Sequence, residues 1–405
     1  MADYGLLGGK LGHSFSPMLH RSFGGYDYDL IEKAPDELES FLISGEYKGF
    51  NVTIPYKKAV IPYCYCLSQT AATIGSVNTV VRRGEKLYGD NTDYYGFLAL
   101  VRKSGIDVGG KKALILGNGG VAPTIAFALK MLGADKVIII SRTGENNYVN
   151  LSRHYDAEII VNATPVGMYP NNGESLVDLS LFPKLCGVLD VVYNPLRTKL
   201  VCDAEKLGIP SAGGLYMLVA QAAKAVELFT DKCIAEAEID RVYGEVLGKV
   251  RTIVLIGMPG CGKSSCAVEL CKLRRQDYID VDGEIVKRAA CTIPEIFEKS
   301  GEDDFRRLET EVLRDACKES GKIIATGGGV VTRPENYELL HQNGVIVLLN
   351  RDIAALPTDG RPLSQANPLE KLASERMPLY KSWCDFEVCG HSPLDTAEKV
   401  LEVLK

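Results

Sequence analysis

The sequence predicts an α/β protein with at least two parallel-sheet units. Short apolar segments alternate with amphipathic ones along most of the chain, which is typical of strands that alternate with helices. Two segments, 111–132 and 251–271, each have the pattern of a strand, a glycine-rich loop and a helix. At 405 residues the chain is also too long for one ordinary core, so two or three folding units are expected.

The composition is that of a globular chain without a broad basic surface. Hydrophobic residues make up 46%, charged residues 24%, and the formal net charge is −6. This balance argues against nucleic-acid or membrane partners, although a local pocket can still bind small anions. The sequence has no apolar run of membrane-spanning length and no signal-peptide pattern at its start, so we expect a cytoplasmic protein. Homo-oligomerisation stays open.

The twelve cysteines predict neither disulfides nor a metal site. Cys64 and Cys66 form a single C-x-C, paired C-x-x-C clusters are missing, and only five histidines could join them as ligands. We expect reduced thiols, as in cytoplasmic proteins.

The first glycine-rich loop has the pattern of a dinucleotide-binding (Rossmann) unit. It lies between a strand expected at 113–116 and a helix expected near 121–132. Small residues let the chain turn tightly and let a pyrophosphate approach the helix N-terminus. The loop matches G-x-G-x-x-G/A with Gly117, Asn118, Gly119, Gly120, Val121 and Ala122.

The next expected strand, 136–141, favours NADP(H) over NAD(H). It ends in Ser141, Arg142 and Thr143, where an acidic residue would hold a ribose hydroxyl. An arginine suits a 2′-phosphate instead. Glu145 is an unfavourable neighbour for a phosphate, and a simple surface role for Arg142 stays open.

Polar segments that secondary structure does not require surround this unit. In order they are residues 12–17 (GHSFSP), 51–57 (NVTIPYK), 76–79 (SVNT), 89–93 (GDNTD), 162–168 (NATPVGM), 190–195 (DVVYNP) and 213–221 (GGLYMLVAQ). Each alone could be turn chemistry. Together, in this order, they resemble the shikimate dehydrogenase family over about residues 5–247.

The resemblance implies a catalytic dyad of Lys57 and Asp93. A lysine near the substrate ketone can donate a proton as hydride arrives, and the carboxylate can orient it. The resemblance also implies that two serines bind a substrate carboxylate and that four further residues contact the substrate: Ser14 and Ser16, then Thr53, Asn78, Tyr193 and Gln221.

The same resemblance implies two lobes with the site between them. Residues 1–93, joined by helices near 225–248, are expected to form the substrate lobe, and residues 94–224 the NADP-binding lobe. Helices are expected at 215–229 and 232–247, and a short step at 248–250 is the expected domain boundary.

The second glycine-rich loop predicts ATP binding. Residues 257–264 match G-x-x-x-x-G-K-S after a strand expected at 252–256. Backbone amides of such a loop hold phosphates, the lysine reaches the β and γ oxygens, and the serine binds Mg²⁺. The predicted nucleotide contacts are Gly257, Gly260, Cys261, Gly262, Lys263, Ser264 and Ser265.

Five later motifs follow this loop. They are 280–282 (DVD), 305–306 (FR), 327–329 (GGG), 361–363 (RPL) and 376–380 (RMPLY). We expect 278–282 to be extended, which would point both aspartates to one face. The combination resembles the shikimate kinase family over about residues 251–405.

This second resemblance assigns roles to single residues. Asp280 would help to hold Mg²⁺ with Ser264, and Lys263 and Asp282 would take part in catalysis. The expected substrate contacts are Asp282, Arg306, Arg376 and the backbone of Gly327, Gly328 and Gly329, and Arg361 would close over the transferred phosphate. The stretch 350–360 is short and lacks a second lid arginine found in many members, which leaves the adenine contacts open.

The two resemblances agree, because the product of one reaction is the substrate of the other. We therefore expect NADPH-dependent reduction of 3-dehydroshikimate followed by ATP-dependent phosphorylation of shikimate. The alternatives are a dehydrogenase of broader specificity that also uses quinate, a ligand sensor without catalysis, and an unrelated dehydrogenase joined to a generic ATPase. Intact Lys57, Asp93 and Lys263 argue against the sensor.

Overall fold

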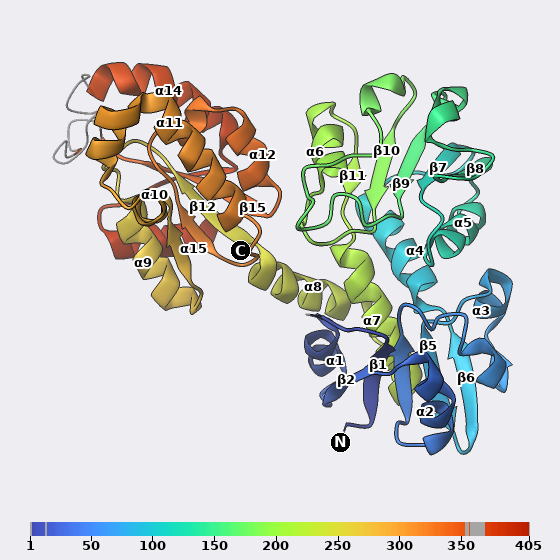
Figure 1. Ribbon diagram of the computed structural model, residues 1–405. Coiled ribbons are helices and arrows are strands. Elements are labelled where there is room, and N and C mark those ends of the chain that lie inside the picture. The colour runs from blue at the N-terminus through green and yellow to red at the C-terminus, as the bar shows by residue number, and fades with distance from the viewer. Residues whose placement is uncertain (1, 13, 353–355, 357–368, 405) are drawn as a thin grey trace. The chain divides into compact units, whose positions relative to one another are not determined.

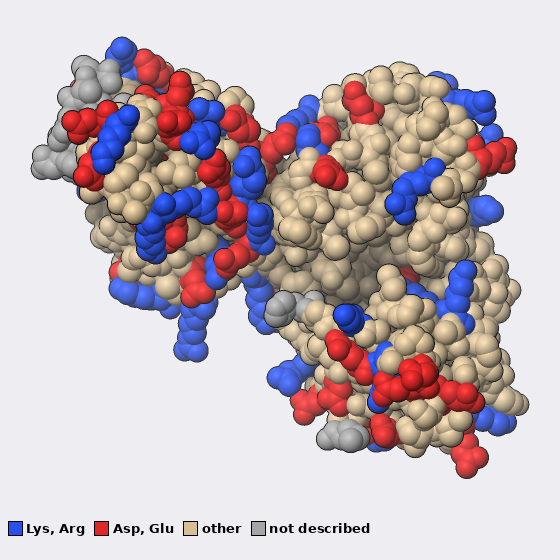
Figure 2. Space-filling model, in the orientation of Figure 1, with Lys and Arg blue, Asp and Glu red and all other residues tan. Residues whose placement is uncertain are grey.

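Three β-sheets organise the chain, two in the first unit (Met1–Val246) and one in the second (Leu247–Lys405). The computed structural model describes residues 2–12, 14–352, 356 and 369–404, and Figure 1 shows their elements. Across the described residues we find no helix that is both long and apolar enough to cross a bilayer. Lys/Arg and Asp/Glu side chains intermingle on the face drawn in Figure 2.

The first sheet is mixed and has six strands in the order β2-β1-β3-β5-β6-β4. Its strands β1, β2 and β3 run parallel, whereas β5 pairs antiparallel with both β3 and β6. Gly84, with φ of 62°, makes the tight turn between β5 and β6. The elements are β1 (Tyr4–Gly8), α1 (Ser16–Gly24), β2 (Tyr28–Glu32), α2 (Leu38–Ser44), β3 (Gly49–Val52), β4 (Cys66–Leu67), α3 (Gln69–Ile74), β5 (Thr79–Arg83) and β6 (Lys86–Asp90).

The second sheet is parallel, with five strands in the order β11-β10-β9-β7-β8. Along β7, Ala113 and Ile115 face one apolar core while Leu114 and Leu116 face the other, as expected of a strand covered on both sides. The elements are α4 (Thr92–Ser104), β7 (Lys112–Leu116), α5 (Ala122–Met131), β8 (Lys136–Ile140), β9 (Ile159–Asn162), β10 (Gly187–Asp190), α6 (Lys199–Lys206), β11 (Ser211–Ala212), α7 (Leu215–Thr230) and α8 (Glu236–Val250).

Helices α4 and α7 pack closely against each other. Helix α4 carries Asp93 in its first turn, and α7 carries Gln221 near its middle. Gly96 allows the close approach, since a Cβ there would lie 2.6 Å from the carbonyl oxygen of Met217. The end of α7 packs on the first sheet through Phe229, whereas Ile239 and Tyr243 of α8 pack on the core of the second sheet. The lobe boundaries themselves stay a prediction.

The third sheet is also parallel, in the order β13-β14-β12-β15-β16. Its central strand β12 is buried at every residue, which suits a parallel strand covered by helices. The elements are β12 (Thr252–Ile256), α9 (Lys263–Arg274), β13 (Tyr278–Asp280), α10 (Val281–Ala289), α11 (Ile293–Ala316), β14 (Ile323–Ala325), α12 (Glu335–His341), β15 (Gly344–Asn350), α14 (Leu369–Trp383), β16 (Phe386–Cys389) and α15 (Pro393–Val403).

Most of the expected helices and strands are confirmed. The expectation that the helix ends before residues 248–250 is wrong. Helix α8 continues through Val250, and the amide of Arg251 still donates to the carbonyl of Leu247 at 2.8 Å. Gly248 therefore lies inside the helix, because continued backbone hydrogen bonding outweighs the penalty of about 1 kcal/mol for an interior glycine.

The expectation that residues 278–282 are extended is also wrong for Val281 and Asp282, which are helical. The strand ends at Asp280, whose carboxylate accepts from the amide of Gly283 at 3.3 Å and caps α10. Asp282 consequently lies in the first helical turn. The capping hydrogen bond, rather than strand alternation, decides where the two carboxylates point.

Candidate active sites

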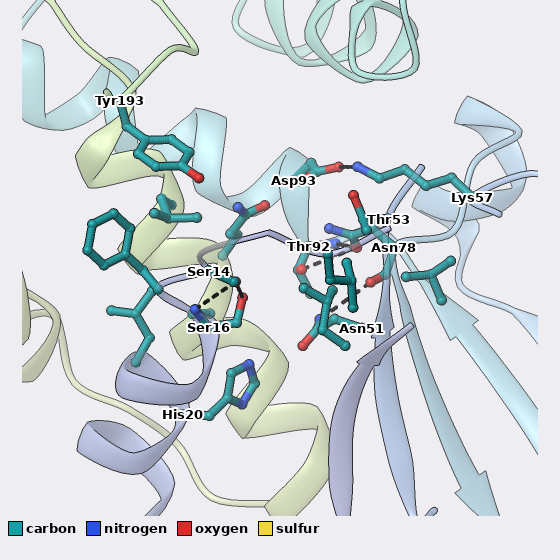
Figure 3. A pocket seen from close by; sticks show the side chains of 18 of the residues that line it. Ser14, Ser16, His20, Asn51, Thr53, Lys57, Asn78, Thr92, Asp93 and Tyr193 are labelled. Carbon is teal, nitrogen blue, oxygen red and sulfur yellow. Dashed lines mark hydrogen bonds and ion pairs between the residues drawn. The ribbon is translucent and has the colours of Figure 1, made fainter. Parts of the chain in front are cut away.

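The first unit holds a pocket of about 340 Å³ that is lined by the first sheet, by α1 and the loop before it, by α4 and α7, and by the segment after β10. Its walls include all eight residues expected to act on or bind the first substrate: Ser14, Ser16, Thr53, Lys57, Asn78, Asp93, Tyr193 and Gln221. Figure 3 labels all of these except Gln221 and shows that the labelled side chains come from several elements and meet around one space. The structure thus brings together residues that are far apart in the sequence.

Lys57 and Asp93 form an ion pair on one wall of this pocket (Figure 3). The Lys57 ammonium donates to Asp93 Oδ2 at 2.6 Å, and both side chains are mostly buried, with 19% and 8% exposed. Asp93 lies in the first turn of α4, which Asn91 caps by accepting from the amide of Tyr94. A lysine held in this way keeps two further N–H groups for a substrate oxygen.

The orientation of the Asn78 amide is set by its neighbours. Its Oδ1 accepts from the Thr92 amide at 2.6 Å and from the Thr79 hydroxyl at 3.1 Å. Thr79 in turn accepts from the Asn51 amide at 2.9 Å. With its oxygen engaged, Asn78 presents its N–H groups to the pocket as donors.

Two serines form a small polar wall opposite. The Ser14 hydroxyl donates to Ser16 Oγ at 3.1 Å and accepts from the Ser16 amide at 3.2 Å. Ser16 is the first residue of α1, so its amide belongs to the open N-terminal turn of a helix. Such a wall suits a carboxylate by hydrogen bonding, yet it carries no charge.

Tyr193 and Gln221 complete the polar lining. Burial raises the pKa of the Tyr193 phenol, which keeps the hydroxyl protonated and able to donate. Gln221 Oε1 is buried and meets no partner among the described residues. Thr53 also lines the pocket, so the lining offers several donors and acceptors for a small molecule rich in hydroxyls.

The lining also contains polar residues that the sequence did not assign to the site, among them Lys10 and His20. His20 stacks on Tyr28 with ring centroids 3.9 Å apart, and its Nδ1 is hydrogen-bonded to the Tyr26 hydroxyl at 2.8 Å. Burial lowers the pKa of His20 to about 3, so the ring is neutral near pH 7. Its position one helical turn after Ser16 was an available signal.

The loop after β7 fits a dinucleotide. Gly117 has φ of 102°, and a Cβ there would lie 2.4 Å from Thr164, so only glycine fits. Asn118, Gly119 and Gly120 are exposed just before α5, which begins at Ala122 after Val121. The backbone amides at this helix N-terminus are therefore accessible to a pyrophosphate.

The residues expected to hold a 2′-phosphate lie directly after β8. Arg142 and Thr143 are exposed, and the amide of Ser141 donates to the carbonyl of Asn146 at 3.1 Å. That hydrogen bond closes a compact turn with Arg142 at its surface. The neighbouring Glu145 is exposed as well.

In the second unit the phosphate loop surrounds the Lys263 ammonium. Gly257, Gly260 and Gly262 have φ of 142°, 84° and 99°, a backbone conformation that residues with a Cβ rarely adopt. Lys263 is buried and donates to the carbonyls of Gly257 and Met258 at 2.9 and 3.0 Å. Cys261 is buried in the loop, whereas Ser264 and Ser265 are exposed at the start of α9.

Ser264 and Asp280 fit a Mg²⁺ ion held mainly by nucleotide phosphates. Mg²⁺ commonly takes one or two protein oxygens and completes its shell with phosphate and water. The described residues contain no cluster of three or more His, Cys, Asp or Glu arranged for a metal. The oxygens available for this purpose are the Ser264 hydroxyl at the start of α9 and the Asp280 carboxylate at the end of β13.

The triple glycine is the meeting point of the second site. A Cβ at Gly327 would lie 2.5 Å from Glu309 Oε1, one at Gly328 2.6 Å from Pro259, and one at Gly329 2.0 Å from Arg306 Nη2. Arg376 donates to the Gly328 carbonyl at 3.1 Å, and the Tyr380 hydroxyl donates to the same oxygen. Asp282 Oδ1 lies 2.9 Å from a Cβ placed at Gly327.

Arg306 is held by a buried carboxylate that the site assignment did not include. Arg306 donates to Glu309 Oε2 at 2.8 Å, with 5% and 0% of the side chains exposed. Burial raises the pKa of Glu309, and the Arg306 cation opposes that shift. Glu309 Oε1 meets no partner among the described residues. Arg361 lies outside the described residues.

Comparisons with known proteins agree with both family resemblances. Residues 6–80 match the family model "Shikimate dehydrogenase substrate binding domain", and residues 259–405 match "Shikimate kinase". A shikimate dehydrogenase (NADP(+)) of Clostridium perfringens is 34% identical over 268 residues, 61% of this chain and 98% of the relative. That of Methanopyrus kandleri is 37% identical over 279 residues, 61% of this chain and 95% of the relative.

Solved structures give the same result for the first unit. A chorismate mutase/shikimate 5-dehydrogenase fusion protein from Clostridium acetobutylicum has a TM-score of 0.58 at 36% identity, covering 60% of this chain and 96% of that chain. The Thermus thermophilus shikimate 5-dehydrogenase, solved with NADP(H) and shikimate, has a TM-score of 0.55 at 30% identity, with 60% and 99% covered.

Proposed function

The chain belongs to the shikimate dehydrogenase family, and we propose on that premise that it reduces 3-dehydroshikimate to shikimate and then phosphorylates shikimate to shikimate 3-phosphate. The observation that carries the first activity is the Lys57–Asp93 ion pair of 2.6 Å inside a pocket of polar, mostly uncharged side chains. The second rests on the phosphate loop and on two arginines that meet at a triple glycine.

In the first site the residues bind the substrate and supply a proton. NADPH, when bound along the loop at Gly117, supplies the hydride. Ser14 and Ser16 hydrogen-bond the substrate carboxylate, and Asn78 donates to a ring hydroxyl. Lys57 lies where it can protonate the oxygen that becomes alkoxide-like, and Asp93 orients the ammonium.

In the second site the residues neutralise charge and align the acceptor. ATP with Mg²⁺ supplies the phosphoryl group. Lys263 and the loop amides bind phosphate oxygens, and Ser264 and Asp280 hold the metal. Arg306 and Arg376 bind the carboxylate of shikimate, and Asp282 orients the accepting hydroxyl. Arg361 is proposed to cover the transferred group.

The cellular setting follows from the thiols and the cofactors. None of the twelve cysteines, all of which lie in the described part of the chain, forms a disulfide, which suits a reducing compartment. We place the protein in the cytoplasm, with small-molecule substrates rather than nucleic acid or membrane as its partners.

The test uses the full-length chain with 3-dehydroshikimate, NADPH, ATP and Mg²⁺. NADPH oxidation is followed by absorbance, and products are identified by mass spectrometry. We expect shikimate 3-phosphate, and shikimate alone when ATP is left out. NADPH oxidation without phosphorylation would remove the second activity from the proposal, and no turnover with both ligands still bound would favour a ligand sensor. Quinate with NAD serves as the specificity control.

A further inference from the structure

The substrate pocket of the first unit carries one positive charge that the dyad does not use. Among the described residues that line it, the charged side chains are Lys10, Lys57 and Asp93. Lys57 and Asp93 neutralise each other at 2.6 Å, and His20 is neutral because burial lowers its pKa to about 3. The charge of Lys10 therefore remains for a ligand.

The chain holds Lys10 at the edge of this pocket. Lys10 follows β1, and the residues on both sides of it are anchored by their backbones. The Gly9 amide donates to the carbonyl of Ile54 at 3.2 Å, and the Leu11 amide donates to Glu32 Oε1 at 2.6 Å. The position of the residue is thus set by the fold, while its side chain is exposed.

Lys10 has no ion pair or hydrogen bond through its side chain to any residue in the described part of the chain. Most surface lysines near a carboxylate pair with it, as Lys48 does with Asp3 at 2.7 Å. An unpaired ammonium on the wall of a pocket can pair with an incoming anion without first breaking a contact within the protein. This lowers the free-energy cost of taking the anion from water.

The proposed substrate brings a carboxylate into a pocket whose anchoring serines are neutral. Ser14 and Ser16 can hydrogen-bond that carboxylate, but they cannot balance its charge. Lys10 lies only four residues before Ser14, on the loop that leads into α1. The same short segment thus supplies both the hydrogen bonds and the counter-charge.

We propose that Lys10 is a specificity-determining residue of the first site, which pairs with the carboxylate of the substrate and selects anionic over neutral ring compounds. The proposal rests on the proposed reduction of 3-dehydroshikimate. Because Lys10 acts on the carboxylate and not on the reacting carbonyl, it contributes to substrate affinity and leaves the chemical step unchanged.

The test compares Lys10→Gln and Lys10→Glu with the parent chain. For Lys10→Gln we expect the KM for 3-dehydroshikimate to rise about threefold to tenfold at low salt, with kcat and the KM for NADPH unchanged. For Lys10→Glu we expect a larger rise. Added salt should weaken binding in the parent and leave Lys10→Gln almost unaffected, because screening acts on the charge that was removed.

The matched control is Lys130→Gln on α5. Lys130 is exposed, does not line the pocket and has no ion pair with a described residue, so its removal changes the net charge equally. For Lys130→Gln we expect the KM for 3-dehydroshikimate, and the change of this KM with added salt, to match those of the parent chain. If the KM for 3-dehydroshikimate rises equally in Lys10→Gln and Lys130→Gln, the effect comes from the net charge of the protein, and the proposal is overturned.

Calorimetry separates this proposal from the proposed function. Shikimate and its methyl ester differ in charge, and binding of both is measured without turnover. Every chain compared also carries Arg376→Met, because the second site is proposed to bind shikimate as well. We expect the parent chain to prefer shikimate, and Lys10→Gln to lose most of that preference. If Lys10→Gln keeps the preference for shikimate, the proposed role of Lys10 is overturned even if the enzyme is active. A variant in which only the KM for NADPH rises would also overturn it, because Lys10 would then act on the cofactor. Failure of turnover in the parent would instead remove the proposed function and leave the binding comparison valid.

Discussion

Among the described residues, the pocket of the first unit contains one internal ion pair and one lysine without a partner, whereas the second site contains three cations. There Arg306 pairs with the carboxylate of Glu309, and Lys263 and Arg376 donate to backbone carbonyls. The number of cations in each site corresponds to the amount of negative charge that its reaction must stabilise. Reduction of a ketone places negative charge on one oxygen and needs one proton, for which a single Lys57–Asp93 pair is sufficient. Phosphoryl transfer concentrates several negative charges, so it requires several cations and a metal.

The two sites also differ in how they hold their cations. The Lys57 pair lies at a pocket wall and remains 19% exposed at the lysine, so the ammonium can reach a substrate. Arg306 is 5% exposed and tied to a fully buried Glu309. Removing one partner of a buried ion pair leaves the other charge buried and uncompensated, which is strongly destabilising. In the second unit, the arginine proposed to bind the substrate is therefore also needed for the stability of the unit.

The largest effect that separates the sites is expected from Lys57→Met. Loss of the proton donor should lower kcat for reduction by roughly 10²- to 10⁴-fold, while phosphorylation of added shikimate stays at the parental rate. Both rates are measured on the same preparation. Reduction within about threefold of the parent would remove Lys57 from the chemical step.

Next comes Arg306→Met, which should destabilise the second unit by about 3–5 kcal/mol because the buried Glu309 carboxylate loses its cation. Trp383, the one tryptophan of the chain, lies in this unit, so its fluorescence in urea reports the unfolding there. Arg307→Met is the control, since Arg307 is exposed and should change stability by about 0.5 kcal/mol or less. Equal effects of the two variants would contradict a structural role for the buried pair.

A smaller, more local effect is expected from Gly329→Ala. The added Cβ would lie 2.0 Å from Arg306 Nη2, so the guanidinium must move and kcat/KM for shikimate phosphorylation should fall by about tenfold to a hundredfold. Gly244→Ala in α8 is the matched control, because a Cβ there meets no atom within 4 Å. Reduction of 3-dehydroshikimate should be unchanged in both variants. A Gly329→Ala enzyme with parental kinetics would argue against contact between Arg306 and the substrate.

The effect with the smallest change per step of the experiment is the pH dependence of stability contributed by His20. Its pKa falls from 6.5 to about 3 on folding, so between these values the unfolded chain binds more protons than the folded one. The stability contribution is present above pH 6.5 and is lost as the pH falls through about 3. His20→Phe keeps a stacking ring and should remove this slope, which reaches at most about 1.4 kcal/mol per pH unit.

The measurement for His20 is hydrogen exchange with mass spectrometry. Samples equilibrate in urea at each pH and are pulse-labelled at one fixed pH, and peptides from β1 to β3 report the first unit. The parent should unfold at lower urea as the pH decreases from about 7 to about 4, and the variant should show a flatter response. Parallel curves would show that His20 does not titrate on unfolding in this range.

Several site residues were predictable from the sequence because their chemistry is local. The two glycine-rich loops follow apolar strands, and the backbone conformation that they need restricts the residue type wherever they occur. Strands β7 and β12 were predictable for a similar reason, since a strand buried on both faces is apolar at nearly every residue.

Residues whose roles depend on long-range contacts could not be derived in the same way. Lys57 and Asp93 are 36 positions apart and form a pair only because β3 and the start of α4 meet at one pocket. The resemblance supplied both residues, but their distance and burial come from the fold. Lys10 and His20 gave no motif of their own, and Asp282 was misplaced because a capping hydrogen bond ended the strand early.

The sequence by itself determined the fold class, the two nucleotide-binding loops and the residue types of both sites, because glycine conformations and apolar periodicity act within a few residues. Only the tertiary structure decided which charges neutralise one another. Lys57 pairs with Asp93 and Arg306 pairs with Glu309, whereas Lys10 has no partner for its charge within the described part of the chain. Electrostatic pairing depends on distance and burial in space, and neither can be read from the order of residues along a chain.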